Sequence, residues 1–190
     1  MPPKRPAAAP PLLIDAPFGR IRSLRPSDVD ERLLAWFADP EIMRAINLAP
    51  QPATKPEMRR YVEAFDNRTK MILGIFDTRG KLVGLVLGEM SPRHRSIRIS
   101  LLTGDRSHAA RRVIVKGLPV FFDGLFEKRG IEKIAAHVTE CNEVVGRALE
   151  RAGMQREGHL RGNLLAADGA RRLDQTLYGL LKADRAPQNL

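Results

Sequence analysis

The 190-residue chain has the size of one compact domain, and its 43% hydrophobic and 28% charged residues are typical of a folded protein rather than a disordered one. No apolar run approaches the roughly 20 residues that a membrane-spanning helix needs, so we expect no membrane partner. The formal net charge of +10 fits either an anionic partner or a solvated basic surface. An aromatic content of 5% disfavours a binder of single-stranded nucleic acid, which needs stacking platforms.

The chain ends and the one cysteine bear on organisation and location. Residues 1–16 are rich in Pro and Ala and lack the sustained apolar stretch of a secretory signal, so they predict a flexible tail. Cys141 has no second thiol for a disulfide or a metal cluster, which favours the reducing cytoplasm. The histidines lie far apart without ligand spacing, and we expect no metal. One domain is predicted over 17–183, with a second tail over 184–190.

The first part of this domain predicts a strand followed by three helices. Residues 18–24 alternate apolar with polar side chains or glycine, as a half-buried strand does. Ser27, with Asp30 three positions later, predicts the start of a helix, and a short helical piece follows over 41–46. A capping-box pattern that begins at Thr54 predicts the third helix.

The pattern then changes to strands. Apolar, partly β-branched runs over 70–76 and 81–90 predict a hairpin, and the alternation over 96–103 predicts a third strand. A helical pattern follows over 108–128, with Pro119 inside it.

The C-terminal part alternates strands with one helix. We expect a strand over 131–138, a helix that Asn142 caps, and two strands over 155–161 and 172–181. This order implies an α/β (α+β) fold, with a mixed sheet and helices on both faces. An anionic ligand is expected at the helix N-terminus that follows Gly104-Asp105, because unpaired N–H groups and the helix dipole favour negative charge there.

Short motifs along most of the chain match one known pattern in order and spacing. They are Leu24-Arg25-Pro26-Ser27-Asp28, Trp36 to Met43, Ile134 to Val138, Asn142, Leu149 to Met154, Glu157 to Arg161, Asp174 and Tyr178 to Leu181. Together they resemble the GNAT superfamily of N-acetyltransferases, and specifically its RimJ/RimL-like branch. The resemblance implies a mostly antiparallel sheet with a V-shaped splay between two central parallel strands, here 98–103 and 131–138.

The same resemblance implies an acyl-CoA-dependent N-acyltransferase. Acetyl-CoA, or another acyl-CoA, would lie in the V as co-substrate and would pass its acyl group directly to an amine in a ternary complex. The acceptor would be a protein N-terminus or a small molecule, and the resemblance leaves room for a homodimer. It implies contacts to the pantetheine arm from Leu101, Leu102, Thr103 and Asn142. The helix N-cap is a second role open to Asn142.

The loop that should hold the pyrophosphate departs from the family pattern. The family uses two glycines whose backbone N–H groups wrap the diphosphate, and the matching positions here are Ala110 and Arg112, or Ala109 and Arg111 with the register shifted by one. Arg111 and Arg112 either replace those donors with charge-assisted contacts to phosphate or fill the groove. We therefore include Ala110, Arg111 and Arg112 among the candidate cofactor-binding residues.

Two further departures concern the chemistry. Val145 stands where this branch often has a serine near the sulfur, and Arg98 stands where an acidic residue is common, so neither supplies the expected proton donor or acceptor. The candidate catalytic residues are His108, beside the loop, and Tyr178, for which core packing is the other interpretation. The alternative to an enzyme is a catalytically inactive GNAT-fold module that binds an anionic ligand or nucleic acid.

Overall fold

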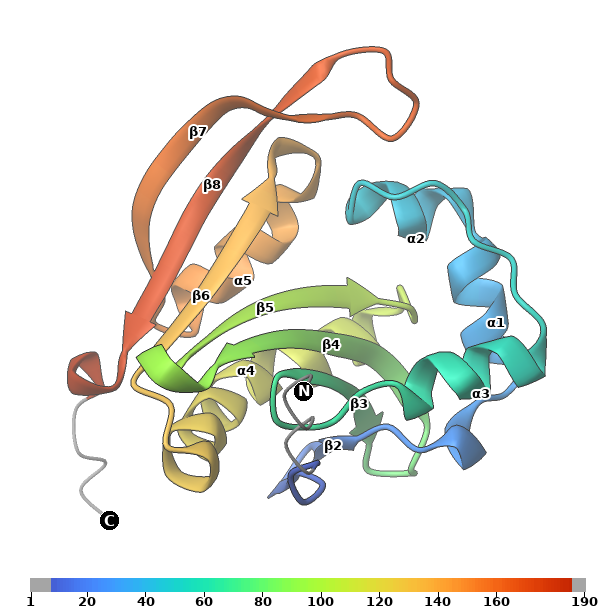
Figure 1. The fold of residues 1–190 in the computed structure, drawn as a ribbon, viewed down its shortest axis with the longest axis horizontal. Coiled ribbons are helices and arrows are strands. Elements are labelled where there is room, and N and C mark those ends of the chain that lie inside the picture. Colours follow the sequence, from blue (N-terminus) through green and yellow to red (C-terminus); the bar gives the residue numbers. More distant parts are fainter. Residues whose placement is uncertain (1–7, 186–190) are drawn as a thin grey trace, which may run out of the picture.

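Residues 8–185 are described by a computed structural model, in which a single sheet of eight strands runs through the molecule (Figure 1). The strands are β1 (Leu13–Ala16), β2 (Gly19–Ser23), β3 (Lys70–Asp77), β4 (Leu82–Ser91), β5 (Ser96–Thr103), β6 (Lys133–Thr139), β7 (Gln155–Leu165) and β8 (Arg172–Leu181). Their order across the sheet is β1-β2-β3-β4-β5-β6-β8-β7. Among the pairs that these strands form, only β5–β6 is parallel.

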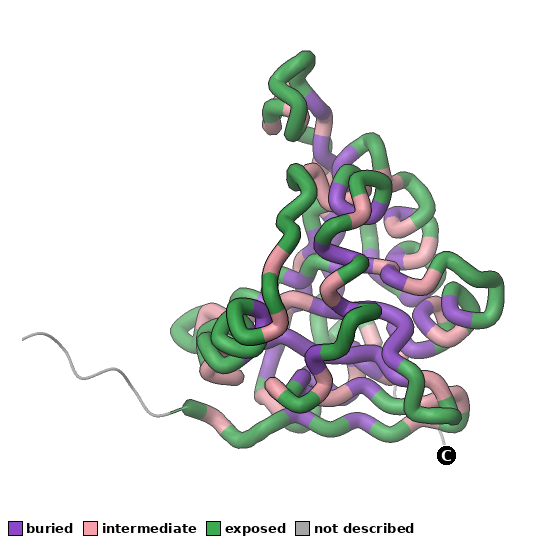
Figure 2. Tube along the Cα trace, turned by 90° about the vertical axis from the view of Figure 1, so that its right-hand side faces the viewer, coloured by how far each residue is buried: buried purple, intermediate pink, exposed green. Residues whose placement is uncertain are grey.

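Helices cover both faces of this sheet. They are α1 (Glu31–Ala38), α2 (Pro40–Ala45), α3 (Lys55–Glu63), α4 (His108–Arg129) and α5 (Glu143–Arg151). Side chains of β5 divide between the faces: Ile97, Ile99 and Leu101 join the apolar cluster under α4 and α5, whereas Leu102 joins the cluster under α1, α2 and α3. Buried positions follow the middle of the molecule in Figure 2. The predicted fold class is confirmed.

Helix starts follow local capping chemistry. The capping box predicted at Thr54 is present, with Glu57 accepting from the Thr54 backbone at 2.8 Å. The start predicted at Ser27 is wrong: residues 26–28 form a short 3-10 turn, and α1 begins after Asp30, whose side chain accepts from the N–H of Leu33. An Asp at the N-cap was sufficient to fix the start, and the capping-box spacing from Ser27 was coincidental.

The described residues nearest to each chain end belong to the folded body. Leu12 and Ile14 are buried, and β1 pairs with β2, so the tail predicted over 1–16 is wrong for residues 12–16. Residues 1–7 and 186–190 lie outside the described residues. At the other end, Arg185 donates two hydrogen bonds to Asp123 on α4, at 2.7 and 2.6 Å, which places 184–185 with the folded body.

Candidate functional site

The parallel pair opens partway along its length. β5 and β6 are paired from Ser96 and Lys133 up to Ile99 and Ala136, and they share no pairing beyond those two residues. Each strand stays paired on its outer side, β5 with β4 and β6 with β8, so the two diverge as rigid arms. Figure 1 shows the arrows starting side by side and separating. The V-shaped splay predicted from the sequence is present.

A cavity of about 690 Å³ occupies the splay and extends over the sheet face beneath α2 and α3. We call it the splay cavity. Its lining comprises Ala45, Ile46 and Leu48 after α2; Tyr61 and Phe65 around α3; Lys70, Leu87, Gly88 and Glu89; Arg98 to Leu102; Ala136 to Thr139; Asn142, Val145 and Leu149; and Leu160, Asn163, Leu164 and Gln175. Its walls are thus mostly apolar, with a few polar groups on the floor, as is usual for small-molecule sites.

The charged groups of the floor lie in one row across three strands. Strand register places Lys70 opposite Glu89, and Glu89 opposite Arg98. Since directly opposite residues share a face, all three side chains lie on the α1–α3 side of the sheet. Glu89 and Arg98 form an ion pair there. Arg98, expected on the central strand in place of an acid, therefore has an acid as its neighbour on β4.

His137 lies where the splay begins. It is the first β6 residue beyond the last β5–β6 pair, and it alternates with buried Ala136 and Val138, so its side chain lies on the face that carries Arg98. Burial, together with the positive charge of Arg98, lowers the pKa of His137 below its ordinary value. At neutral pH the imidazole is therefore uncharged and able to accept a proton.

Thr139 supplies a polar atom without a protein partner. Its side chain is 8% exposed, and among the described residues its Oγ1 makes no hydrogen bond. Thr139 lines the splay cavity. Since buried hydroxyls are normally paired, this atom fits hydrogen bonding to a ligand in the cavity.

Two asparagines connect α2 to the far arm of the splay. Asn142 occupies the N-cap position of α5, as predicted, but its side chain does not cap the helix; its Nδ2 donates to the carbonyl of Ala45 at 3.1 Å. Asn47, in a left-handed backbone conformation, donates to the carbonyl of Leu165 and accepts from the N–H of Ala167, both at 2.9 Å. These bonds form a roof that we call the asparagine bridge.

The residues expected to contact the pantetheine arm divide into two groups. Leu101, Leu102 and Asn142 line the splay cavity, whereas Thr103 is half-buried at the end of β5, outside the lining. On the α5 side the lining is apolar, formed by Val145 and Leu149. Neither of these side chains is able to donate a proton to a departing thiolate.

Some backbone N–H groups at the N-terminus of α4 already have hydrogen-bond partners within the protein. The helix begins at His108, as predicted, and Ser107 caps it by accepting from the N–H of Ala110 at 3.2 Å. The N–H of Arg111 makes the first intrahelical bond, to the carbonyl of Ser107. The side chains of Arg111 and Arg112 are exposed on the first turn, and neither forms an ion pair within residues 8–185.

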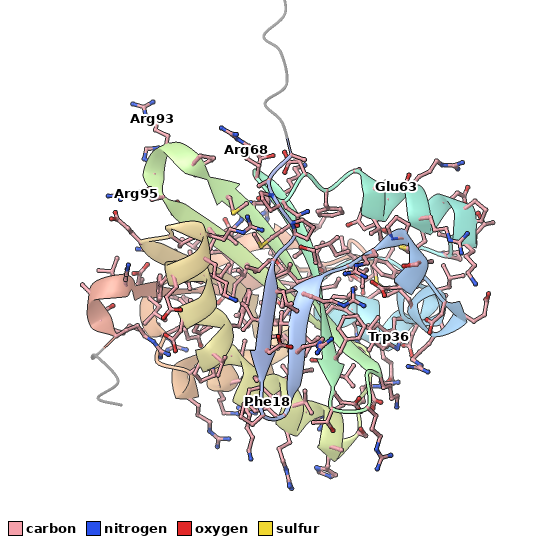
Figure 3. The ribbon with its side chains drawn as sticks, turned by 90° about the horizontal axis from the view of Figure 1, so that it is seen from below. Phe18, Trp36, Glu63, Arg68, Arg93 and Arg95 are labelled. Atoms are coloured by element: carbon pink, nitrogen blue, oxygen red, sulfur yellow. The ribbon has the colours of Figure 1, made fainter. Side chains whose placement is uncertain are left out.

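A carboxylate also lies in this loop. Asp105 accepts from Lys81 Nζ at 2.6 Å and from the N–H of Ser107 at 2.9 Å. These bonds hold the pKa of Asp105 at about 2, because they favour its ionised form. Beside it, Gly104 lies against the indole of Trp36, where an added Cβ would come within 2.0 Å of the ring. Figure 3 labels Trp36 on the α1 side of the molecule.

The two candidate catalytic residues lie outside the splay cavity. His108 is exposed at the first position of α4. Tyr178 is 5% exposed within the core under α5, and its hydroxyl lies 3.3 Å from Glu150 Oε1. The residues that sequence reasoning missed are Glu89 and His137. The signal for His137 was its alternation with buried neighbours in Ile134 to Val138, which fixes the face that it occupies.

Two kinds of feature are absent from the described part of the chain. Between residues 8 and 185, no helix combines the length and apolar character needed to cross a membrane. Over the same residues, no group of three or more His, Cys, Asp or Glu side chains is arranged to hold a metal ion.

The basic side chains of Arg68, Arg93 and Arg95 project outward at one end of the sheet in Figure 3.

Comparison with known proteins agrees with this geometry. The acetyltransferase (GNAT) domain family matches residues 20–155. The chain therefore belongs to the GNAT family of acetyltransferases. Among curated proteins, none matches it in sequence.

Solved structures support the same fold. A GNAT-family acetyltransferase from Bacillus anthracis superposes with a TM-score of 0.73 at 19% identity, covering 90% of this chain and 98% of that one. Spermidine N-acetyltransferase from Vibrio cholerae, in complex with CoA and spermine, gives 0.71 at 22% identity, covering 86% and 95%. A putative acetyltransferase from T. thermophilus gives 0.69 at 26% identity, covering 93% and 92%.

Proposed function

We propose that the chain is an acetyl-CoA-dependent N-acetyltransferase that acts by direct transfer to an amine. The splay cavity carries this proposal, since the β5 edge beyond Ile99 has no partner strand and faces an apolar groove wide enough for an extended arm. The motifs from Trp36 to Met43 and from Leu149 to Met154 favour the RimJ/RimL-like branch. The single cysteine favours the cytoplasm.

The groove suits the pantetheine arm. Beyond Ile99, every second residue of β5 directs its backbone N–H and C=O toward the splay, where an extended amide-containing chain adds to a strand edge through main-chain hydrogen bonds. The unpaired hydroxyl of Thr139 offers one further hydrogen bond. The side chain of Asn142 already bonds to Ala45, so it contributes to the arm only if that bond is exchanged.

The loop at the start of α4, where the diphosphate of CoA would bind, departs from the family pattern. Ser107 and Asp105 occupy donors that a glycine loop would leave for phosphate, and the Asp105 carboxylate repels an anion. The first-turn side chains of Arg111 and Arg112 are unfavourably placed against the helix dipole by about 0.3–1 kcal/mol unless an anion lies beside them. We therefore assign diphosphate binding to these two guanidinium groups rather than to the backbone.

His137 is the residue proposed to accept the proton of the amine. Acetyl-CoA supplies a thioester, and the transfer forms a nitrogen–carbon bond, breaks the carbon–sulfur bond and moves one amine proton to a base. A neutral His137 at the opening of the splay meets the requirement for that base. Because Val145 and Leu149 donate no proton, the thiolate leaves into solvent contact and is protonated there.

The acceptor is an exposed amine of a protein N-terminus or of a small molecule. The Vibrio cholerae neighbour has spermine in its structure. The carboxylate on the floor of the present cavity, Glu89, is already paired with Arg98, so the same acceptor is not carried over to this chain.

A CoA-binding experiment tests the proposal directly. Ligand at about 100 times its dissociation constant stabilises a protein by roughly 2.7 kcal/mol, which for a domain of this size raises the melting temperature by about 5–11 °C. We expect such a shift with acetyl-CoA and with CoA, followed by release of free thiol when an amine panel is added. The absence of any shift, with acetyl-CoA, CoA and longer acyl-CoAs, contradicts the proposal.

A second candidate, a non-catalytic module that binds an anion, is favoured by one observation. The α4 N-terminus keeps a serine cap and an ionised Asp105 where a turnover-competent family member has open backbone donors. A thermal shift with CoA but no thiol release from acetyl-CoA on any amine of the panel would favour this module over the enzyme.

A further inference from the structure

The charge of the splay cavity identifies the chemistry of its acceptor. Among the described residues that line it, Glu89 is the one carboxylate, and two cations, Lys70 and Arg98, lie on either side of it in register. Arg98 pairs with Glu89, whereas Lys70 forms no ion pair within the described residues. The floor therefore has one uncompensated positive charge.

The remaining lining does not change this balance. Most groups above the floor are apolar or aromatic, and the polar ones, which are the hydroxyls of Ser100 and Thr139 and the amides of Asn142, Asn163 and Gln175, carry no charge. Asn163 Nδ2 donates to Gln175 Oε1 at 2.6 Å, which occupies part of their capacity. Burial lowers the pKa of His137, so this ring adds no charge at neutral pH. A polycationic amine would meet no free carboxylate here.

The position of the excess charge relative to His137 fixes where an anionic group would lie. Along β5, Arg98 is two residues before Ser100, which is about 7 Å at the usual rise of a strand. Arg98 pairs with Ala135, and His137 is the next β6 residue on that face, so the base and Arg98 are separated by about one side-chain repeat. Lys70 lies two strands farther across the sheet, about 10 Å from Arg98 at the usual strand spacing, and the extended side chains of the two residues together span that distance.

From these observations we infer that the acceptor is an amine that carries a carboxylate a few bonds away, an amino-carboxylate, bound by Lys70 and Arg98 with its amine toward His137. The inference rests on the proposed function and names the substrate class of the same site. Complementary charge at the floor favours an anionic over a cationic ligand, although solvent screens the side chains of Arg98 and Glu89, which are 53% and 57% exposed.

Three amines of matched length test this. They are β-alanine, propylamine and 1,3-diaminopropane, which share a three-carbon skeleton and differ in whether its far end bears a carboxylate, a methyl group or a second amine. With saturating acetyl-CoA, we expect kcat/KM for β-alanine to exceed that of either other amine by at least about 10-fold, and the preference to fall at high salt. Equal or faster transfer to 1,3-diaminopropane would overturn the inference.

Variants connect that preference to the row of charges. Lys70→Gln should raise the KM for β-alanine by about 5- to 10-fold and lower the selectivity for β-alanine over propylamine by the same factor. The matched control is Lys116→Gln, an exposed lysine on α4, which covers the opposite face of the sheet. A Lys70→Gln enzyme with unaltered selectivity would also overturn the inference.

A binding readout separates this inference from the proposed function. Calorimetric titration of the CoA-loaded protein with β-alanine requires no turnover. Binding that depends on Lys70, without any acetyl transfer, would support the acceptor class and contradict the enzyme. Failure of β-alanine to bind, or its binding no better than propylamine, would contradict the acceptor class.

The free amino-carboxylate and an acidic polypeptide N-terminus share this chemistry. Peptides Asp-Ala-Ala amide and Asn-Ala-Ala amide distinguish them, since only the first carries a carboxylate beside its terminal amine. A strong preference for the aspartyl peptide over both β-alanine and the asparaginyl peptide would identify a protein N-terminus as the source. Faster transfer to free β-alanine would identify a small molecule.

Discussion

The splay cavity and the loop between β5 and α4 differ in how their polar groups are satisfied. In the splay cavity, the β5 edge beyond Ile99, the Thr139 hydroxyl and the Lys70 ammonium group lack protein partners among the described residues. In the loop, Asp105 and Ser107 bond to neighbouring backbone and to Lys81. A region that binds a ligand through its backbone keeps hydrogen-bonding groups without protein partners. A loop whose backbone groups already have partners binds a ligand through additional side chains. Arg111 and Arg112 are those side chains.

The largest expected effect comes from the open region. His137→Gln removes the proposed proton acceptor, and general-base catalysis is worth roughly 100-fold or more in rate. We expect kcat to fall by about that factor while the thermal shift with CoA is retained. His94→Gln, an exposed histidine in the turn after β4, is the control and should be silent.

The pH dependence gives an independent check on His137. Because burial and Arg98 lower its pKa, the neutral, proton-accepting form persists to lower pH than for an ordinary histidine. The acid limb of kcat/KM should therefore lie below the ordinary histidine value, with activity rising as pH increases through it, and this limb should be absent in His137→Gln. A profile unchanged by the substitution contradicts the assignment of this base.

The next effect concerns the packing of the loop. Gly104→Ala places a methyl group within 2.0–2.3 Å of the Trp36 ring, and a rigid indole moves only with its helix. Overpacking of this kind costs about 3 kcal/mol, which lowers the melting temperature by roughly 6–12 °C. Gly158→Ala, whose new Cβ would lie 3.4 Å from the nearest atom, is the control. A stable Gly104→Ala variant with normal CoA binding would show that the loop is not fixed by Trp36.

A smaller effect tests the added side chains. Arg111→Ala with Arg112→Ala should weaken CoA binding by about 10-fold if the guanidinium groups bind the diphosphate, because charge-assisted bonds at an exposed site contribute of the order of 1–2 kcal/mol. Lys116→Ala, which removes one exposed positive charge farther along α4, is the control. The dissociation constants of both variants are measured by titration with CoA and with dephospho-CoA, which retains the diphosphate. Unchanged or tighter binding would mean that the arginines obstruct the groove.

The smallest effect is on stability in acid. The bonds from Lys81 and Ser107 hold the pKa of Asp105 at about 2, so its contribution is present above the unfolded value near 3.8 and is lost as pH falls toward about 2. Asp105→Asn should cost about 1 kcal/mol at pH 6 and clearly less at pH 2, where about half of the Asp105 carboxylates in the folded protein are protonated. Denaturant unfolding at the two pH values measures the difference. Equal losses at both would show that the charge of Asp105 is immaterial.

Much of the fold follows from local patterns, and much of the site does not. The alternation over 96–103 and over 172–181 determined both strands, since one buried face leaves little freedom in register. The tail boundary failed at Leu12 and Ile14, because their burial depends on α4, which lies far along the chain from them.

The site required the register of strands that are distant in sequence. The neighbours Lys70, Glu89 and Arg98 come from three strands, and no periodicity within any one of them indicates the row. For Asn142, the N-cap position was predictable, but its bond to Ala45 joins residues 97 positions apart. His108 was selected for its place beside the loop and Tyr178 for its place in the C-terminal strand, and the structure places both away from the cavity.

The asparagine bridge has a consequence for how this scaffold diversifies. One amide side chain, Asn47, fastens residues 165 and 167 of the β7–β8 turn to the segment after α2 through two hydrogen bonds. One substitution, at Asn47, would remove both of these hydrogen bonds between the β7–β8 turn and the segment after α2. A longer or shorter β7–β8 turn would change the width of the splay cavity and so the size of the acceptor that it binds. The strands that position the reacting groups would stay unchanged.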